Sequence, residues 1–186
     1  MYPRDVPTIV CSGNHDYWTK SRLLSVDTDA EAAWLRRLRG QGRVIAVDGD
    51  TVCIDRVTFC VNGGLQTPVL TAPPDVLVTH APPSGCACAA GPSASDCGDP
   101  LIWAAVEQHP PKLLLCVHIH EPFHFATRWP TKDGATVVLV PGCAPESSTP
   151  AYWLVDTLAN TATHSTGDCS TAREGLTTEL RIDLSL

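Results

Sequence analysis

Short apolar runs separated by polar turns dominate the chain, and this pattern is typical of β-strands in a folded domain. Strands are predicted over residues 8–11, 44–47, 51–54, 57–61, 75–80, 112–117, 126–129, 136–140 and 152–155. The turns at 48–50 and 55–56 divide a predicted meander of short strands joined by hairpins. The dipeptide Asp133-Gly134 is a hairpin signal between two later strands. The stretch after Asp156 has no clear pattern, so 152–155 is predicted to be the last strand.

Two segments instead have the features of helices. Residues 30–39 follow the polar cluster 27–29, have an acidic residue in the first turn and end with a basic residue before a glycine. The apolar residues on one face of this helix, which we expect in the core, are Ala30, Trp34, Leu35 and Leu38. A second helix is predicted over 99–108, where Asp99 is the cap and Pro100 the first helical residue. Strands joined alternately by helices and hairpins predict an α/β sandwich of two mixed sheets flanked by helices.

Length and composition indicate one globular domain of ordinary size. The 186 residues are 44% hydrophobic and 18% charged, which excludes disordered and fibrous proteins. Thirteen basic against twenty acidic residues give a net charge of −7, so the basic surface of a nucleic-acid or membrane-surface binder is not expected. No apolar run reaches the length of a membrane span, and residues 1–5 lack the pattern of a secretory signal. We expect a cytoplasmic protein with neither nucleic acid nor membrane as partner; the sequence leaves the oligomeric state open.

Nine cysteines at irregular spacing form no disulfide framework that the sequence can identify, since their number is odd. No Cys-x-x-Cys pair occurs, which argues against a structural zinc site. Cys86 and Cys88 are too close for an ordinary disulfide and lie in a loop of small residues, 84–98. We therefore expect free thiols, many of them buried as small hydrophobic groups.

Histidine-containing loops follow three of the predicted buried strands. They are Gly13-Asn14-His15-Asp16, Thr79-His80-Ala81-Pro82-Pro83 and His118-Ile119-His120. Ligands of open α/β sheets bind beyond the carboxyl ends of strands, so these loops are expected to converge. His118 and His120 are two residues apart, and an extended backbone points both to the same side. Neutral imidazoles and the amide oxygen of Asn14 suit a divalent metal ion.

Each of these patterns also has a plainer explanation. A His-x-His sequence is more often a pair of surface histidines than a pair of ligands, and Gly-Asn is a common turn. A Thr-His-x-Pro-Pro segment can simply be the end of a strand. The order of the three loops, each after an apolar strand, is much more specific than any one of them.

In this order the loops resemble the third, fourth and fifth of the five motifs of calcineurin-like metallophosphoesterases. The similarity extends from Thr8 to about Val155 and includes the strands before the fourth motif and the hairpin after the fifth. It implies a phosphoesterase-like domain over residues 1–155, the C-terminal two-thirds of such a domain, followed by an extension, 156–186. In this family two metal ions activate a bridging hydroxide that attacks the phosphorus of a phosphoester.

The resemblance implies metal ligands at four positions, which are Asn14, His80, His118 and His120. The first three would ligate the second metal, and His120 would ligate the first. His15 would be the general acid that protonates the leaving oxygen, oriented by Asp16. The expected substrate is a small phosphoester, and the expected cofactor is a divalent ion (Mn, Fe, Zn or Mg).

Two features depart from the family pattern. Val117 stands where a glycine usually precedes the histidines of the fifth motif. The first two motifs, an Asp-x-His and a Gly-Asp-x-x-Asp, do not occur in the sequence. They would supply the carboxylate that bridges the two metals, so we expect an N-terminally truncated domain that binds at most one ion and has weak or no activity. The alternative is a non-catalytic remnant that binds a metal or a partner.

A further alternative is a zinc site that recruits Cys11 or Cys116, since both immediately precede the motif loops. Strand residues at these positions are expected to pack inward, which makes a ligand role less favourable than a core role.

Overall fold

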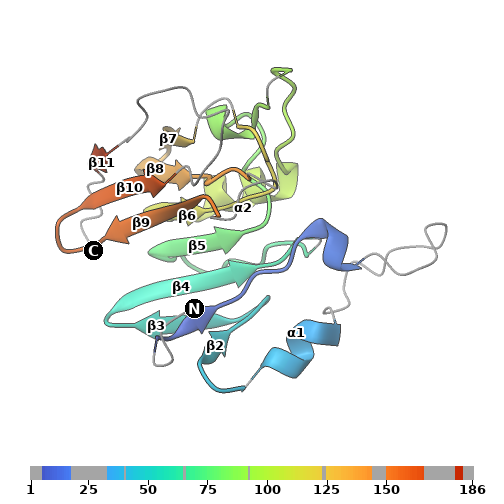
Figure 1. The fold of residues 1–186 in the computed structure, drawn as a ribbon. Helices are drawn as coiled ribbons and strands as arrows, with labels where there is room; N and C mark the ends of the chain where they lie inside the picture. The colour runs from blue at the N-terminus through green and yellow to red at the C-terminus, as the bar shows by residue number, and fades with distance from the viewer. Residues whose placement is uncertain are drawn as a thin grey trace.

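The computed structural model describes residues 6–17, 33–39, 41–64, 66–91, 93–122, 125–143, 150–165 and 179–181. A six-stranded sheet with the strand order β3-β4-β5-β6-β8-β7 forms the centre of this part of the chain (Figure 1). Its strands are β3 (Thr51–Ile54), β4 (Val57–Asn62), β5 (Val76–Thr79), β6 (Leu113–Leu115), β7 (Ala126–Thr131) and β8 (Gly134–Leu139). The four central strands are parallel, whereas β3 and β7 at the edges are antiparallel to their neighbours.

The central strands are apolar on both faces because both faces are covered. Successive side chains of a strand point to opposite sides, so Leu77 and Val76 belong to different core clusters. On one side Leu77 packs in a cluster with Ile102 and Val106 of α2 (Pro100–Gln108). On the other side Val76 packs in a cluster with Ala162.

A three-stranded antiparallel sheet supplies the cover on that second side. Its strands are β9 (Tyr152–Asp156), β10 (Thr161–Ser165) and β11 (Glu179–Arg181), in the order β11-β10-β9. Ala162 of β10 is fully buried, and Trp153 and Val155 of β9 pack against the same cluster. Figure 1 shows β9 and β10 on the side of the central sheet opposite α2.

A smaller parallel pair, β1 (Thr8–Ile9) with β2 (Val44–Ala46), carries the first motif loop. The helix α1 (Ala33–Leu38) packs there through Leu35, which is fully buried together with Val47. Two short 3-10 helices complete the described elements, η1 (Asn14–Tyr17) and η2 (Ala87–Ala89).

The α/β sandwich of mixed sheets predicted from the sequence is confirmed. The helix predicted over 99–108 is also confirmed, because the Asp99 carboxylate accepts a hydrogen bond from the Leu101 N–H at 2.7 Å as an N-cap. The hairpin at Asp133-Gly134 is present between β7 and β8. Ala30 and the cluster 27–29 lie outside the described residues.

Three details of the prediction were wrong. The strand 44–47 does not join a meander, because β2 pairs in parallel with β1, so of the three strands predicted there β3 and β4 alone form a hairpin. The strand 152–155 is not the last, because β10 and β11 follow it. The strand over 112–117 is shorter, since β6 begins at Leu113 and ends at Leu115.

Among the described residues, the longest helices are too short, or too polar, to cross a bilayer.

Candidate metal centre

The three histidine loops meet at one edge of the molecule, two of them after parallel strands of the central sheet and the first after β1 of the smaller pair. His80 follows the last residue of β5, and His118 lies three residues beyond the end of β6. Asn14 begins η1 after β1. In Figure 1 the arrowheads of β4 and β5 point toward the blue turn η1. The sequence therefore places a polar side chain beyond the carboxyl end of each strand, where α/β sheets form their binding sites.

Three donor atoms meet at this edge. The Nε2 atom of His80 lies 3.0 Å from Oδ1 of Asn14 and 2.9 Å from Nδ1 of His118. The two imidazole rings stand edge to face, with centroids 4.7 Å apart. Gly13 lies against this group, since a Cβ there would approach Cε1 of His80 to 3.1 Å. The structure thus brings together the three residues predicted to share one metal ion.

The spacing of these atoms fits the coordination shell of a divalent ion. Octahedral ligands about 2.1 Å from an ion lie about 3.0 Å from one another along an edge. The two observed contacts have this length. Among the described residues, no group of three or more His, Cys, Asp or Glu side chains could hold a metal ion. The group described above has two histidines and the amide oxygen of Asn14 as its third donor. The ligand roles of these three residues stay predictions.

The electrostatic surroundings keep both imidazoles neutral near pH 7. Burial, followed by the neighbouring His118, lowers the pKa of His80 from 6.5 to about 4, against a smaller opposing effect of Asp16. Burial also lowers the pKa of His118, followed by His120 and His15. A neutral imidazole is the form that ligates a metal. The same interactions show that His15 and His120 lie near the pair.

The backbone at His118 differs from the extended conformation predicted for this loop. His118 has a φ of +68°, in the left-handed region that a residue with a side chain rarely adopts. The Ile119 N–H donates to the Val117 carbonyl at 2.7 Å, which closes a tight turn around His118. Val117 itself has no positive φ, so this backbone does not require a glycine there. The prediction of an extended backbone at His118 was therefore wrong, and the relative direction of the His118 and His120 side chains stays a prediction.

The remaining predicted residues surround this group. His15 and Asp16 are exposed in η1, and the Asp16 carboxylate accepts a hydrogen bond from the Gly13 N–H at 2.7 Å. His120 is exposed, and its carbonyl accepts the N–H of Cys143 at 2.8 Å. The general-acid role of His15, the orienting role of Asp16 and the ligand role of His120 remain predictions.

Sequence reasoning missed the proximity of Asp99. Its charge acts on His118 and opposes the lowering of that pKa. The Asp99 N–H donates to the Pro82 carbonyl at 2.8 Å, which returns the loop 84–98 to the segment after His80. In the sequence Asp99 is recognisable only as a helix cap. Its position near His118 could not be predicted, because the two residues are far apart along the chain.

The surroundings of Cys11 and Cys116, the two alternative metal ligands, favour the protonated thiol over the thiolate. Burial raises the pKa of the Cys11 thiol strongly, with smaller contributions from Asp48 and Asp16. Cys116 is buried and has a pKa well above its ordinary value for the same reason. Its Sγ lies 3.7 Å from the Leu139 carbonyl as a donor. A protonated thiol is a poor metal ligand, so the structure favours core roles for both.

Comparison with known families agrees with this fold. The family model for calcineurin-like phosphoesterases matches residues 1–122, about two-thirds of the chain, including all three histidine loops. The chain therefore belongs to the calcineurin-like phosphoesterase family. No curated protein matches the chain, and neither does any solved structure.

Proposed function

We propose that the chain is a metal-dependent phosphoric-ester hydrolase in which Asn14, His80 and His118 hold one divalent ion. The observation that carries this proposal is the meeting of Asn14 Oδ1, His80 Nε2 and His118 Nδ1 within 3.0 Å and 2.9 Å contacts. When bound there, a divalent ion supplies Lewis-acid stabilisation of phosphoryl charge and a water molecule of lowered pKa. The family membership supports a hydrolase of phosphoesters.

His15 is the proposed general acid for the leaving oxygen. It is exposed at the start of η1, next to the proposed ligand Asn14, and it lies near both His80 and His118. A side chain in this place can reach a substrate bound at the ion. Proton donation of this kind accelerates reactions by about 10²–10⁴-fold, so it assists the metal and does not replace it.

The donor set predicts weak binding. All three proposed ligands are neutral, and no carboxylate among them offsets the charge of the ion. The sequence contains neither an Asp-x-His nor a Gly-Asp-x-x-Asp motif. His120, the proposed ligand of a second ion, is exposed. We therefore expect the 186-residue chain to bind at most one ion and to turn over phosphoesters slowly or not at all.

The test combines metal binding with turnover. The 186-residue protein is titrated with Mn²⁺ and assayed with a nitrophenyl phosphomonoester and a nitrophenyl phosphodiester. The variant His80→Ala, His118→Ala removes the two imidazoles, whereas His109→Ala removes a histidine at the far end of α2. Saturable binding that disappears only in the double variant supports the proposal. Binding that survives in the double variant, or no saturable binding in the wild type, contradicts it.

A second candidate function, a module that binds metal without hydrolysis, is favoured by the wholly neutral donor set. The two candidate functions predict different activities for a protein that also contains the first two family motifs. A protein extended by in-frame upstream residues that contain both motifs should hydrolyse the nitrophenyl esters if the first candidate is right. If no such residues are encoded, or if the extended protein binds Mn²⁺ without turnover, the second candidate is right.

A further inference from the structure

We propose that Asp48 is a positioning residue that holds Asn14 in place for metal binding. This proposal rests on the metal site described above, but it concerns a residue outside that site. Asp48 lies in the turn between β2 and β3, far from the three motif loops in the sequence. Its side chain nevertheless reaches the segment that carries Asn14.

Asp48 is a buried carboxylate with only 3% of its surface exposed. Its Oδ1 accepts the N–H of Ser12 at 3.0 Å, and its Oδ2 accepts the hydroxyl of the same serine. Ser12 is 1% exposed, and its Oγ also accepts the N–H of Gly64 at 3.3 Å. Burial of a charged group is unfavourable unless hydrogen bonds satisfy it, and bonds to a carboxylate are stronger than neutral ones. Asp48 therefore fixes Ser12 from both its backbone and its side chain.

The backbone just after β4 lies close to the segment that contains Ser12 and Asn14. A Cβ at Gly63 would lie 1.8 Å from Oδ2 of Asp48, so this position has no room for a side chain. A Cβ at Gly64 would lie 2.6 Å from the backbone nitrogen of Asn14. Because they have no side chains, the two glycines let the backbone just after β4 approach the loop closely. Asn14 is thus confined between this backbone and the bonds of Asp48 to Ser12.

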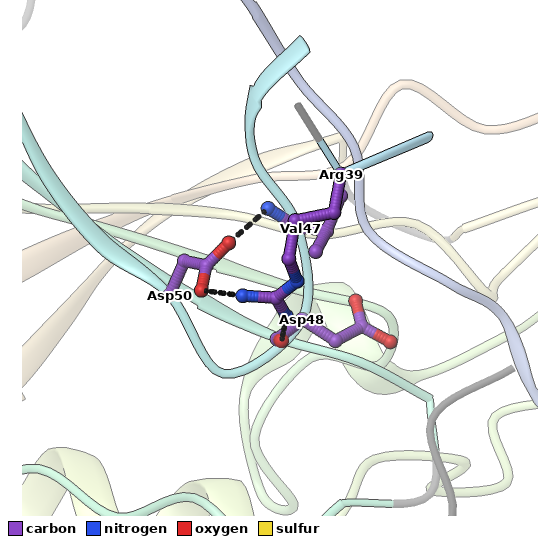
Figure 2. A network of polar contacts seen from close by, with 4 residues as sticks. All are labelled: Arg39, Val47, Asp48 and Asp50. Carbon is purple, nitrogen blue, oxygen red and sulfur yellow. Dashed lines mark hydrogen bonds and ion pairs between the residues drawn. The ribbon is translucent and has the colours of Figure 1, made fainter. Parts of the chain in front are cut away.

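The turn that carries Asp48 is itself fixed (Figure 2). Arg39 donates to the Asp48 carbonyl at 3.3 Å and forms an ion pair with Asp50. The Asp50 carboxylate accepts the Val47 N–H at 2.9 Å. On the other side, the Gly49 N–H donates to the Val61 carbonyl at 2.9 Å, with Gly49 at a φ of +83°. Contacts with Arg39, next to α1, and with β4 thus hold the turn in place, and with it the Asp48 side chain that binds Ser12.

The consequence for the site follows from the short path between the residues. Ser12 is two residues before Asn14, whose Oδ1 contacts His80 at 3.0 Å. A shift of Ser12 moves this oxygen away from the two imidazoles. Residues that orient metal ligands typically contribute about 10–100-fold to metal affinity. We expect Asp48→Asn to weaken Mn²⁺ binding by about tenfold.

The matched control is Asp75→Asn. Asp75 is another partly buried carboxylate that accepts a backbone hydrogen bond, from Thr58 at 2.9 Å, and it pairs with Lys112. It lies at the start of β5, the opposite end of the strand from His80. Both substitutions remove one carboxylate from the same fold, and only Asp48→Asn should change Mn²⁺ affinity.

A second measurement separates this proposal from the function it rests on. In the protein without added metal, nuclear Overhauser contacts between the Asn14 side-chain amide and the His80 ring report their distance directly. These contacts should weaken in Asp48→Asn and persist in Asp75→Asn. If Asp48→Asn does not fold, Ser12→Ala, which removes only the hydroxyl partner, takes its place. Unchanged contacts in a folded variant overturn the proposal, whether or not the wild type binds Mn²⁺.

Discussion

Two regions of the described part of this chain contain several side chains that can bind metals, and they differ in where those side chains lie. At the edge of the sheet, His80 and His118 meet Asn14 with their donor atoms about one coordination edge apart. In the loop 84–98, Cys86 and Cys88 are buried against the central sheet. The first region has the arrangement of a metal-binding site, and the second is part of the hydrophobic core.

The thiols of this loop, together with Cys116 just after β6, behave as small hydrophobic groups. Cys88 and Cys116 are 0% and 3% exposed and pack in the same cluster as Leu77. A hydrogen bond with Cys86, together with burial, raises the pKa of Cys88, and burial raises that of Cys116. The Cys86 thiol, which has the reverse role in this bond, has a lowered pKa. The comparison shows that burial separates these core thiols from His80 and His118, the half-buried imidazoles proposed as ligands.

The largest expected effect comes from substitution of His118. Loss of one of three ligands should weaken Mn²⁺ binding by at least about tenfold in both His118→Gly and His118→Ala. The two variants should differ in stability, because residue 118 has a φ of +68°. A side chain in this region costs about 1–2 kcal/mol that glycine avoids, so His118→Gly should be the more stable in urea unfolding. An alanine variant as stable as the glycine variant would contradict the left-handed turn.

A substitution in the thiol region should have the opposite pattern. Cys88→Ala leaves a small cavity in the cluster around Leu77 and should lower the free energy of unfolding by about 1–2 kcal/mol. Mn²⁺ affinity should remain that of the wild type. The exposed Cys97 offers a control, since Cys97→Ala should change neither quantity. Weaker metal binding in Cys88→Ala would show that the two regions are not separate.

A smaller effect is expected from pH. His80 has a pKa of about 4 when folded and an ordinary value of 6.5 when unfolded. The unfolded chain therefore binds the proton first, and stability is complete above about pH 6.5 and falls as the pH is lowered toward about 4. Unfolding by urea at about pH 7.5 and about pH 5 should show a larger loss in the wild type than in His80→Gln. An equal loss in the two proteins would contradict the burial of the neutral imidazole.

The convergence of the three loops could be predicted because it depends on local signals. Each loop follows an apolar strand, and parallel strands end at a common edge. The tight turn at His118 could not be predicted, because no residue near it is a glycine and the conformation is imposed by contacts such as the Val117 N–H with the His80 carbonyl. The contact of Asp48 with Ser12 was equally inaccessible, since it joins residues 36 positions apart.

The sheet formed by the end of the chain shows a different limit. β10 alternates buried and partly buried residues, with Ala162 and His164 inward. Only one of these two is apolar, and the pattern of hydrophobic residues therefore gives little signal. His164 is buried because its ring packs beside Phe125 and Trp153 and contacts the Pro141 carbonyl at 2.9 Å. Tertiary packing, and not the local sequence, defines this strand.

The central claim is that one divalent ion binds to His80 and His118 together. The most direct test is electron spin-echo spectroscopy of Mn²⁺ added to protein labelled with ¹⁵N-histidine. We expect coupling to imidazole nitrogens of two histidines in the wild type, reduced coupling in His80→Ala, and none in the double variant His80→Ala, His118→Ala. Coupling that is absent from the wild type, or that is unchanged in the double variant, would contradict it.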